Sequence, residues 1–321
     1  MWGPDVLGDG WQSRTLTLRP DERGEVVATL VRRVVPTPRR RAVLYLHGYV
    51  DYFFQTHLGD FWDAQGFDFY ALDLRGYGRS LLSHQVPNDV SALAVYAEEL
   101  DAAVRVIRAE EGHDVVVLNA HSTGGLVGAL WLDARAGRAT GPMIDAAVLN
   151  SPWFDLNRPW FDRVVGTRGI DVLGRFAPQV VVGQTAPYYG QWLRSPDGGG
   201  WSFDLAWKPD EGFGVRAGWF RAIRRGHATL ARGLAVDVPV LVCASTATGP
   251  ADRWHDALDR TDSVLDVEHI VGRAPRIGPD VTVVQVPDGV HDLALSREPA
   301  RTAYLDAVAE WVGARVPPAA G

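Results

Sequence analysis

A serine follows an apolar run that stops abruptly. Residues 115–132 read VVVLNAHSTGGLVGALWL, with β-branched residues leading to Ser122 and a helical pattern beginning at Leu126. A serine on a tight strand-to-helix turn can act as a nucleophile, and its strained backbone needs small neighbours. The usual pattern is Gly-x-Ser-x-Gly, and here Ala120 replaces the first glycine while Gly124 keeps the second. One extra methyl group permits the turn if the surrounding residues leave room.

A histidine that could serve as the general base follows the last strand-like run. That run is VTVVQVP at 281–287, and His291 comes just after it, 169 residues beyond Ser122. A base that is hydrogen-bonded to a serine hydroxyl removes its proton as the oxygen attacks a carbonyl carbon. Of nine histidines, only this one follows a late strand. No arrangement of the others is typical of a metal site, so we expect neither a metal nor an organic cofactor.

The rest of the chain supplies elements that would position these side chains. Short apolar runs alternate with helical patterns, which predicts an α/β protein with a mostly parallel sheet covered by helices on both faces. We expect an antiparallel entry hairpin from residues 15–18 and 25–34. We expect further strands at 42–48, 67–76, 114–120, 146–152, 238–244 and 281–287, and helices at 90–110, 126–136 and 300–312.

Four predicted strand ends carry residues that could do chemistry. These residues are, one set for each strand, His47-Gly48-Tyr49, residues 73–80, Ser122 and residues 288–292. Ligands of open α/β sheets bind at the carboxyl ends of strands, so these residues would meet at one edge. Together, in this order, they resemble the α/β-hydrolase superfamily, most closely its branch of monoacylglycerol lipases, lysophospholipases and serine aminopeptidase (S33)-like hydrolases. The resemblance runs from about residue 40 to 312 and is weakest in the middle of the chain.

Two backbone N–H groups are candidates for an oxyanion hole. The first N–H groups of a helix have no partner within it, so the Thr123 N–H can stabilise negative charge beside Ser122. The resemblance implies that the second donor is the N–H of Tyr49, the residue after His47-Gly48. His47 would then begin this turn in a structural role.

The resemblance also implies that the acid follows the next-to-last strand, giving the chain order Ser, Asp, His. The residues just after the strand at 239–243 contain no carboxylate, which departs from the family pattern. Asp262 begins the sequence Asp-Ser-Val-Leu, similar to the acid loop of the family, and precedes His291 by 29 residues. We therefore choose Asp262 and infer an insertion at about 245–260.

Other aspartates remain alternatives for the acid. Asp266 is the next choice, but it could equally cap a helix at 267–277. Asp155 is the third, because some hydrolases take the acid from the preceding strand end. Asp252 and Asp256 lie inside the inferred insertion and rank lower.

Residues 151–235 interrupt the alternation of strands and helices. This segment holds six of the twelve tryptophans, and its eleven basic and seven acidic residues give +4, which leaves −11 for the rest of the chain. We expect residues 1–150 and 236–321 to form the hydrolase core and residues 151–235 to form an inserted lid, or cap, over the carboxyl edge of the sheet. The alternative is a group of helices that pack on the core without a role in binding.

Aromatic residues near the predicted site suggest an apolar pocket. His121 adjoins Ser122, and although its side chain should turn into the core, we include it among the candidate residues. The residues that we expect to bind substrate are Tyr52, Phe53, His121, Trp153, Phe154 and Trp160.

Composition narrows the class of protein. The chain has 321 residues and a net charge of −7, so it lacks the basic footprint of a nucleic-acid-binding protein. It has no apolar run of about 18 residues and no recognisable signal peptide, so we expect no integral membrane segment. The lone Cys243 forms no intrachain disulfide, which favours a reducing compartment, and we expect a cytoplasmic protein.

These residues predict a serine hydrolase whose partner is a small acyl substrate. We expect it to cleave a carboxylic ester, such as an acyl glycerol, a lysophospholipid or a small ester, through an acyl-enzyme on Ser122. One alternative is an aminopeptidase of the proline-aminopeptidase type, which needs an acidic anchor such as Asp204, Asp210 or Glu211. Others are a pathway-specific thioesterase, acyltransferase or cyclase and, as the last choice, a non-catalytic ligand-binding protein.

Overall fold

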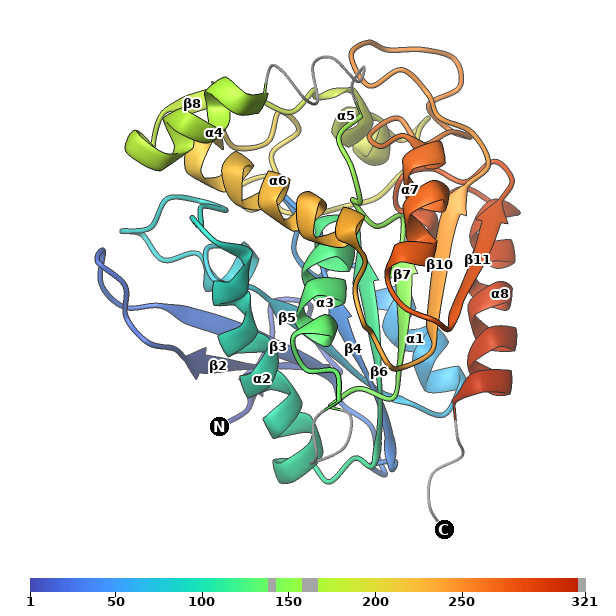
Figure 1. The fold of residues 1–321 in the computed structure, drawn as a ribbon. Helices are drawn as coiled ribbons and strands as arrows, with labels where there is room; N and C mark the ends of the chain where they lie inside the picture. Colours follow the sequence, from blue (N-terminus) through green and yellow to red (C-terminus); the bar gives the residue numbers. More distant parts are fainter. Residues whose placement is uncertain (138–142, 158–166, 317–321) are drawn as a thin grey trace.

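A nine-stranded sheet forms the centre of the computed structural model, which describes residues 1–137, 143–157 and 167–316 (Figure 1). The strand order is β1-β2-β3-β5-β4-β6-β7-β10-β11. The first three strands pair antiparallel, as does β3 with β5, while the pairs from β5 to β11 are parallel. The strands are β1 (Gly3–Pro4), β2 (Trp11–Thr17), β3 (Val27–Arg33), β4 (Arg41–Leu46), β5 (Asp68–Asp73), β6 (Val115–His121), β7 (Ala146–Asn150), β10 (Val240–Ser245) and β11 (Val281–Val286).

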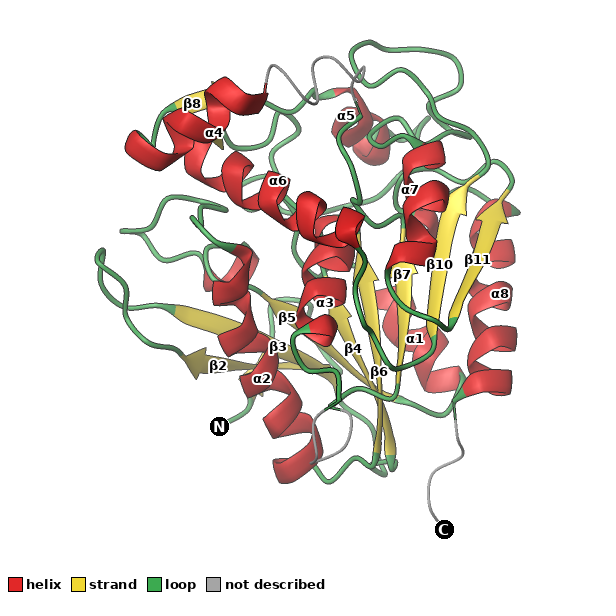
Figure 2. Ribbon diagram, viewed as in Figure 1, coloured by secondary structure: helices red, strands yellow, loops and turns green. Residues whose placement is uncertain are grey.

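Helices cover both faces of this sheet (Figure 2). One face packs against α2 (Ala97–Arg105), α3 (Thr123–Asp133) and α7 (Val267–Arg273). The other packs against α1 (Thr56–Ala64) and α8 (Ala300–Arg315). Within the described ranges, no helix combines the length and the apolar character needed to span a bilayer.

The predicted fold class and hairpin are confirmed, but two elements differ from expectation. The helix expected at 90–110 consists of three pieces: a 3-10 turn at Leu93–Tyr96, then α2, then one π-helical turn at Val106–Glu110. Helix α1 was not predicted. It buries only Leu58, Gly59 and Trp62, too few for a recognisable helical period.

The side chains of strand β6 alternate between the two faces of the sheet, and the strand leads directly to Ser122. All seven of its residues are buried. Leu118 and Ala120 face the core on the α3 side, while Val115 and Val117 face the core on the α1 and α8 side. The strand ends at the carboxyl edge of the sheet, and Ser122 follows immediately.

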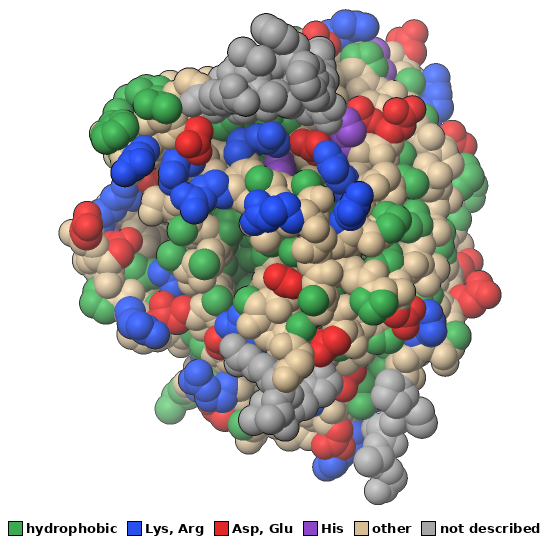
Figure 3. Space-filling model, in the orientation of Figure 1, with side chains coloured by type: hydrophobic (Ala, Val, Ile, Leu, Met, Phe, Trp, Pro, Cys, Tyr) green, Lys and Arg blue, Asp and Glu red, His purple; other side chains and the backbone are tan. Residues whose placement is uncertain are grey.

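The described parts of the segment at 151–235 lie above this carboxyl edge in Figure 1. Its described elements are α4 (Thr167–Phe176), β8 (Val181–Gly183), α5 (Tyr188–Arg194), β9 (Val215–Arg216) and α6 (Ala217–Arg232). A third apolar cluster joins Trp192 and Leu193 of α5 to Tyr52, Phe54 and Leu295 of the core. Basic side chains form a band over α6 on the face shown in Figure 3.

Candidate active site

Ser122 occupies a strained turn between β6 and α3. Its backbone angles, φ 52° and ψ −118°, lie in a region that residues with a side chain rarely adopt. Small neighbours are required here, because a Cβ on Gly124 would lie 2.4 Å from the His47 carbonyl oxygen. Ala120 is tolerated because it faces Gly128 of α3, where even an added Cβ would lie 3.8 Å from the Ala120 Cβ.

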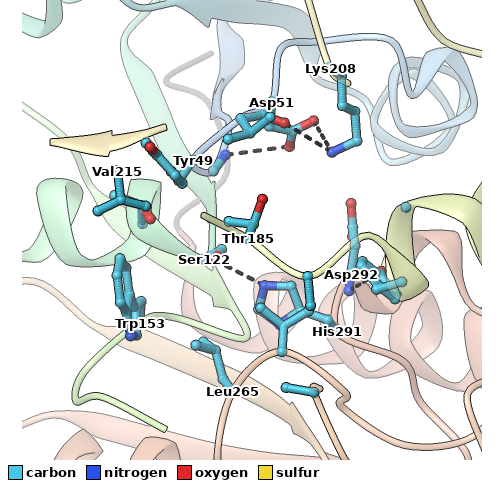
Figure 4. Close-up of a pocket in the computed structure, with 18 of the residues that line it drawn as sticks. Tyr49, Asp51, Ser122, Trp153, Thr185, Lys208, Val215, Leu265, His291 and Asp292 are labelled. Carbon is cyan, nitrogen blue, oxygen red and sulfur yellow. Dashed lines mark hydrogen bonds and ion pairs between the residues drawn. The ribbon is translucent and has the colours of Figure 1, made fainter. Parts of the chain in front are cut away.

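A chain of hydrogen bonds joins Ser122, His291 and Asp262. His291 Nε2 lies 3.0 Å from Ser122 Oγ, and His291 Nδ1 lies 3.0 Å from Asp262 Oδ2 (Figure 4 shows the first contact). All three residues are buried, and Asp262 is completely so. With its proton on Nδ1, the ring donates to Asp262 and accepts the Ser122 hydroxyl proton at Nε2. This is the arrangement that activates a serine nucleophile.

A long loop after β10 brings Asp262 to this position. After β10 the chain leaves the sheet and returns so that Thr248 and Asp262 form a parallel bridge. The Asp262 N–H donates to the Ala247 carbonyl at 2.9 Å, and the Gly249 N–H donates to the Asp262 carbonyl at 2.8 Å. The acid thus lies beside the end of β10 although it comes much later in sequence.

The two alternative acids lie elsewhere. Asp266 is the N-cap of α7 and accepts a hydrogen bond from the Glu268 N–H. Asp155 pairs with Arg224 and Arg273, each at 3.1 Å. The alternatives Asp266 and Asp155 are therefore not the partner of His291, whose Nδ1 contacts Asp262.

The two residues that carry the candidate oxyanion donors line the same cavity as Ser122. Within the described part of the chain, the backbone N–H groups of Tyr49 and Thr123 have no protein acceptor. Both residues line a cavity of about 530 Å³ together with Ser122 and His291. The Tyr49 ring stacks on Trp219 of α6, with ring centroids 3.9 Å apart. An oxygen bound next to Ser122 could accept from both N–H groups.

Only some of the predicted substrate-binding residues line this cavity. Trp153 does, together with Val215, Trp219 and Leu265, and these side chains give it an apolar wall (Figure 4 labels three of them). Trp160 lies outside the described residues.

Tyr52, Phe53 and Phe154 do not line the cavity, so this prediction is wrong for them. Each is buried in a different apolar cluster. Tyr52 packs in a cluster with Trp192 and Leu193 of the segment at 151–235, and its hydroxyl accepts a hydrogen bond from the Asp204 N–H. An aromatic residue next to a site can fill either the pocket or the core, and the residue type does not distinguish the two.

His121 is buried but does not turn away from the site as expected. Its ring centroid lies 4.8 Å from that of His291, and the residue lines the cavity. Burial lowers the pKa of His121, which favours the neutral ring. A neutral His121 adds no positive charge that would compete with protonation of His291.

Sequence analysis missed one ion pair in the cavity. Lys208 Nζ lies 2.8 Å from Asp51 Oδ1, and both residues line the cavity wall (Figure 4). The signal was present in the sequence, because Lys208 is the single lysine among 32 basic residues. Nothing in the pattern around it indicated a contact with Asp51, which lies 157 residues away.

Residues 73–80 were expected at a strand end. They contact the chain just after the Tyr49 turn from outside the cavity. Asp73 Oδ1 accepts a hydrogen bond from the Phe53 N–H at 3.0 Å. Arg79 pairs with Asp73 and Asp5, each at 2.8 Å. These buried charges are compensated within the group, so this run supports the site without facing it.

The sheet order, the strained serine turn and the Ser122–His291–Asp262 contacts define the α/β-hydrolase fold. Residues 37–253 match the family described as serine aminopeptidase, S33, and the chain belongs to this family of hydrolases. The matched region includes Ser122 but ends before Asp262 and His291. A search of curated proteins gave no match.

Several solved structures share this fold along nearly the whole chain. A monoglyceride lipase from Saccharomyces cerevisiae, in complex with a substrate analogue, has a TM-score of 0.67 at 14% identity, covering 95% of both chains. A monoacylglycerol lipase from Paleococcus ferrophilus has a TM-score of 0.60 at 19% identity, covering 89% of this chain and 99% of the other. A carboxyl esterase from Bacillus coagulans has a TM-score of 0.65 at 11% identity, covering 94% and 98%.

Proposed function

We propose that the protein cleaves carboxylic esters through an acyl-enzyme on Ser122. The observation that carries this proposal is the pair of 3.0 Å contacts that join Ser122, His291 and Asp262 at the wall of a partly apolar cavity. The hydrolase family supports the reaction class. The lipases and the esterase that share the fold favour an ester over an amide bond.

The proposed reaction has two stages. His291 Nε2 takes the Ser122 proton as Oγ attacks the ester carbonyl carbon, and the N–H groups of Tyr49 and Thr123 stabilise the oxyanion. His291 then donates the proton to the leaving alcohol, which departs and leaves the acyl-enzyme. Water, activated by the same ring, attacks this acyl group and releases the acid. Asp262 holds the ring in the required tautomer throughout.

The substrate class follows from the cavity wall. Trp153, Trp219 and Leu265 offer apolar contacts for an acyl chain, while Asp51 and Lys208 give one polar side. We infer an acyl glycerol, a lysophospholipid or a small ester. In this proposal residues 151–235 act as the lid, because Trp153, Lys208 and Trp219 all come from them. A cytoplasmic location remains a prediction from the single, buried Cys243.

The test compares hydrolysis of p-nitrophenyl esters with acyl chains of two to sixteen carbons. Wild-type protein is expected to show activity that peaks at one chain length, and Ser122→Ala is expected to lose at least about a thousandfold in kcat. Ser202→Ala, which changes an exposed serine of the inserted segment, should match the wild type. Equal ester hydrolysis by Ser122→Ala and the wild type would rule the proposal out.

The family description makes an aminopeptidase the second candidate. Asp210 is the one residue among the three predicted acidic anchors that lines the cavity within the described chain, and it forms an ion pair with Arg194. A carboxylate already paired in this way is a weak anchor for a substrate amine. Hydrolysis of aminoacyl arylamides but not of esters would favour this candidate, and hydrolysis of acyl thioesters alone would favour a thioesterase.

A further inference from the structure

The turn that carries the Tyr49 N–H is strained. Val50 has φ 49°, a conformation that is rare for a β-branched residue. Such a backbone persists only where surrounding contacts fix it, and it is often found at functional sites. The contacts that hold this turn therefore decide where the Tyr49 N–H points.

Lys208 holds the turn from the inserted segment. Its Nζ lies 2.8 Å from Asp51 Oδ1 and 3.5 Å from the Val50 carbonyl oxygen. The other carboxylate oxygen of Asp51 accepts the Gly48 N–H at 3.4 Å, which closes the turn. The ammonium group thus contacts two consecutive residues directly after Tyr49.

The side chain of Tyr49 is held from the same segment. Its ring stacks on Trp219, and Val50 packs close to Gly212, where an added Cβ would lie 3.2 Å from Val50 Cγ2. The inserted segment therefore contacts the turn at Tyr49, Val50 and Asp51.

Lys208 also neutralises a buried carboxylate that lines the same cavity as Ser122. Asp51 is 2% exposed. Burial alone would raise its pKa, but the Lys208 ammonium group beside it holds the pKa of Asp51 below its usual value, so the group is ionised. Unpaired, this negative charge would oppose the negative charge that develops on the substrate oxygen.

We propose that Lys208 is a positioning residue for the oxyanion hole. Through Val50 and Asp51 it fixes the turn so that the Tyr49 N–H faces the oxygen bound next to Ser122, and it cancels the charge of Asp51. The inference rests on the proposed serine chemistry, but it does not depend on which acyl substrate is natural. It also means that the oxyanion hole is complete only with the inserted segment in place.

The test uses the rate at which a fluorophosphonate labels Ser122. In this reaction Oγ attacks phosphorus, fluoride leaves, and His291 takes the serine proton, so the rate reports on the serine, the base and the oxyanion hole without an acyl substrate. We expect Lys208→Met to lower the second-order labelling rate about tenfold to a hundredfold, since losing one oxyanion donor costs about a hundredfold or more. Arg315→Met, which removes an exposed ion pair with Asp280 at the end of α8, should label at the wild-type rate.

A double variant separates the effect of the lost charge from the effect of lost positioning, and it controls for misfolding of the single variant. Lys208→Met leaves Asp51 buried and unpaired, which is destabilising, whereas Lys208→Met/Asp51→Asn removes both charges and keeps an oxygen for the Gly48 N–H. We expect the double variant to fold and to label faster than the single variant but several-fold slower than the wild type. Labelling of the folded double variant at the wild-type rate would overturn the positioning role.

Ester kinetics give an independent readout. With the ester that is cleaved best, Lys208→Met should lower kcat and leave KM within about twofold, and the affinity for a trifluoromethyl ketone should fall in parallel with kcat/KM. A higher KM with unchanged kcat would instead make Lys208 a substrate contact and overturn the proposal. If no ester is cleaved but Ser122 is labelled, the ester proposal fails while the labelling comparison still tests Lys208.

Discussion

Asp262 and Asp266 are four residues apart but have different surroundings. Asp262 Oδ2 contacts His291, while its Oδ1 accepts the N–H groups of Val264 and Leu265 at 2.9 and 2.8 Å. These bonds fix the orientation of the carboxylate, so the imidazole is held in one tautomer. Asp266 instead caps α7, where it accepts the Glu268 N–H.

An asparagine scan of the two positions tests this assignment. Asp262→Asn is expected to lower kcat for ester hydrolysis by roughly ten-thousandfold, because an amide favours the wrong imidazole tautomer. Asp266→Asn should keep wild-type activity, since asparagine caps a helix as well as aspartate does. Steady-state kinetics on the same ester measure both, and a comparable loss in Asp266→Asn would contradict the assignment.

The loop between β10 and Asp262 is the element that sets the position of the acid. A small polar network closes it: Thr261 Oγ1 donates to the Ala257 carbonyl at 2.7 Å, and Ser263 Oγ lies 3.0 Å from His255 Nε2. Gly249 packs directly against this network. A Cβ there would lie 2.3 Å from Thr261 Oγ1 and 2.6 Å from Ser263 Oγ.

Gly249→Ala is therefore expected to impair catalysis from outside the cavity. Displacing the loop by a fraction of an ångström would move Asp262 from His291 and lower kcat by about tenfold to a hundredfold, with little change in KM. Gly272→Ala in the neighbouring α7 is the matched control, because an added Cβ there meets nothing within 4 Å. Steady-state kinetics of the two variants test this prediction. Equal kcat values would show that the loop accommodates the methyl group without moving Asp262.

At the scale of the whole molecule, several histidines that are fully or partly buried are held neutral. Burial lowers the pKa values of His57, His113, His121 and His227. The pKa of His227 falls to about 3 through burial and the adjacent Arg224. Its Nε2 lies 3.0 Å from the Trp153 carbonyl, to which a neutral ring donates, and its Nδ1 accepts from Arg224 Nη1 at 3.2 Å.

This burial makes stability depend on pH. Above about pH 6.5 His227 is neutral in both the folded and the unfolded chain. Below it the unfolded chain binds a proton that the native state does not, so stability falls as the pH drops towards 3. We expect His227 to account for about 2 kcal/mol of the loss in unfolding free energy between pH 7.5 and pH 5.

Urea unfolding at these two pH values measures the effect. His227→Gln should be less stable than the wild type at pH 7.5, but its loss on acidification should be smaller by about 2 kcal/mol, because glutamine does not titrate. The same loss in both proteins would show that His227 does not carry the pH dependence.

The sequence was most informative where the backbone restricts the choice of residue. The strained turn at Ser122 admits only small neighbours, and the parallel strands bring their carboxyl ends together, so Ser122 and His291 could be placed from patterns alone. The positions of Tyr52, Phe53 and Phe154 could not be predicted in this way. Each of these side chains packs into a different one of three apolar clusters, and the residue type does not indicate which. The Lys208–Asp51 pair depends on how the inserted segment folds back onto the core, which no local pattern encodes.

The bridge between Thr248 and Asp262 also has a practical use. It closes the loop at its base, while residues 252–254 at the tip are exposed. The entropy cost of a loop rises only slowly with its length, so added residues at the tip would leave its base in place. A tag or a small reporter domain grafted between Asp252 and Trp254 should thus be carried by an enzyme that still functions, since the graft and the acid would be mechanically separate.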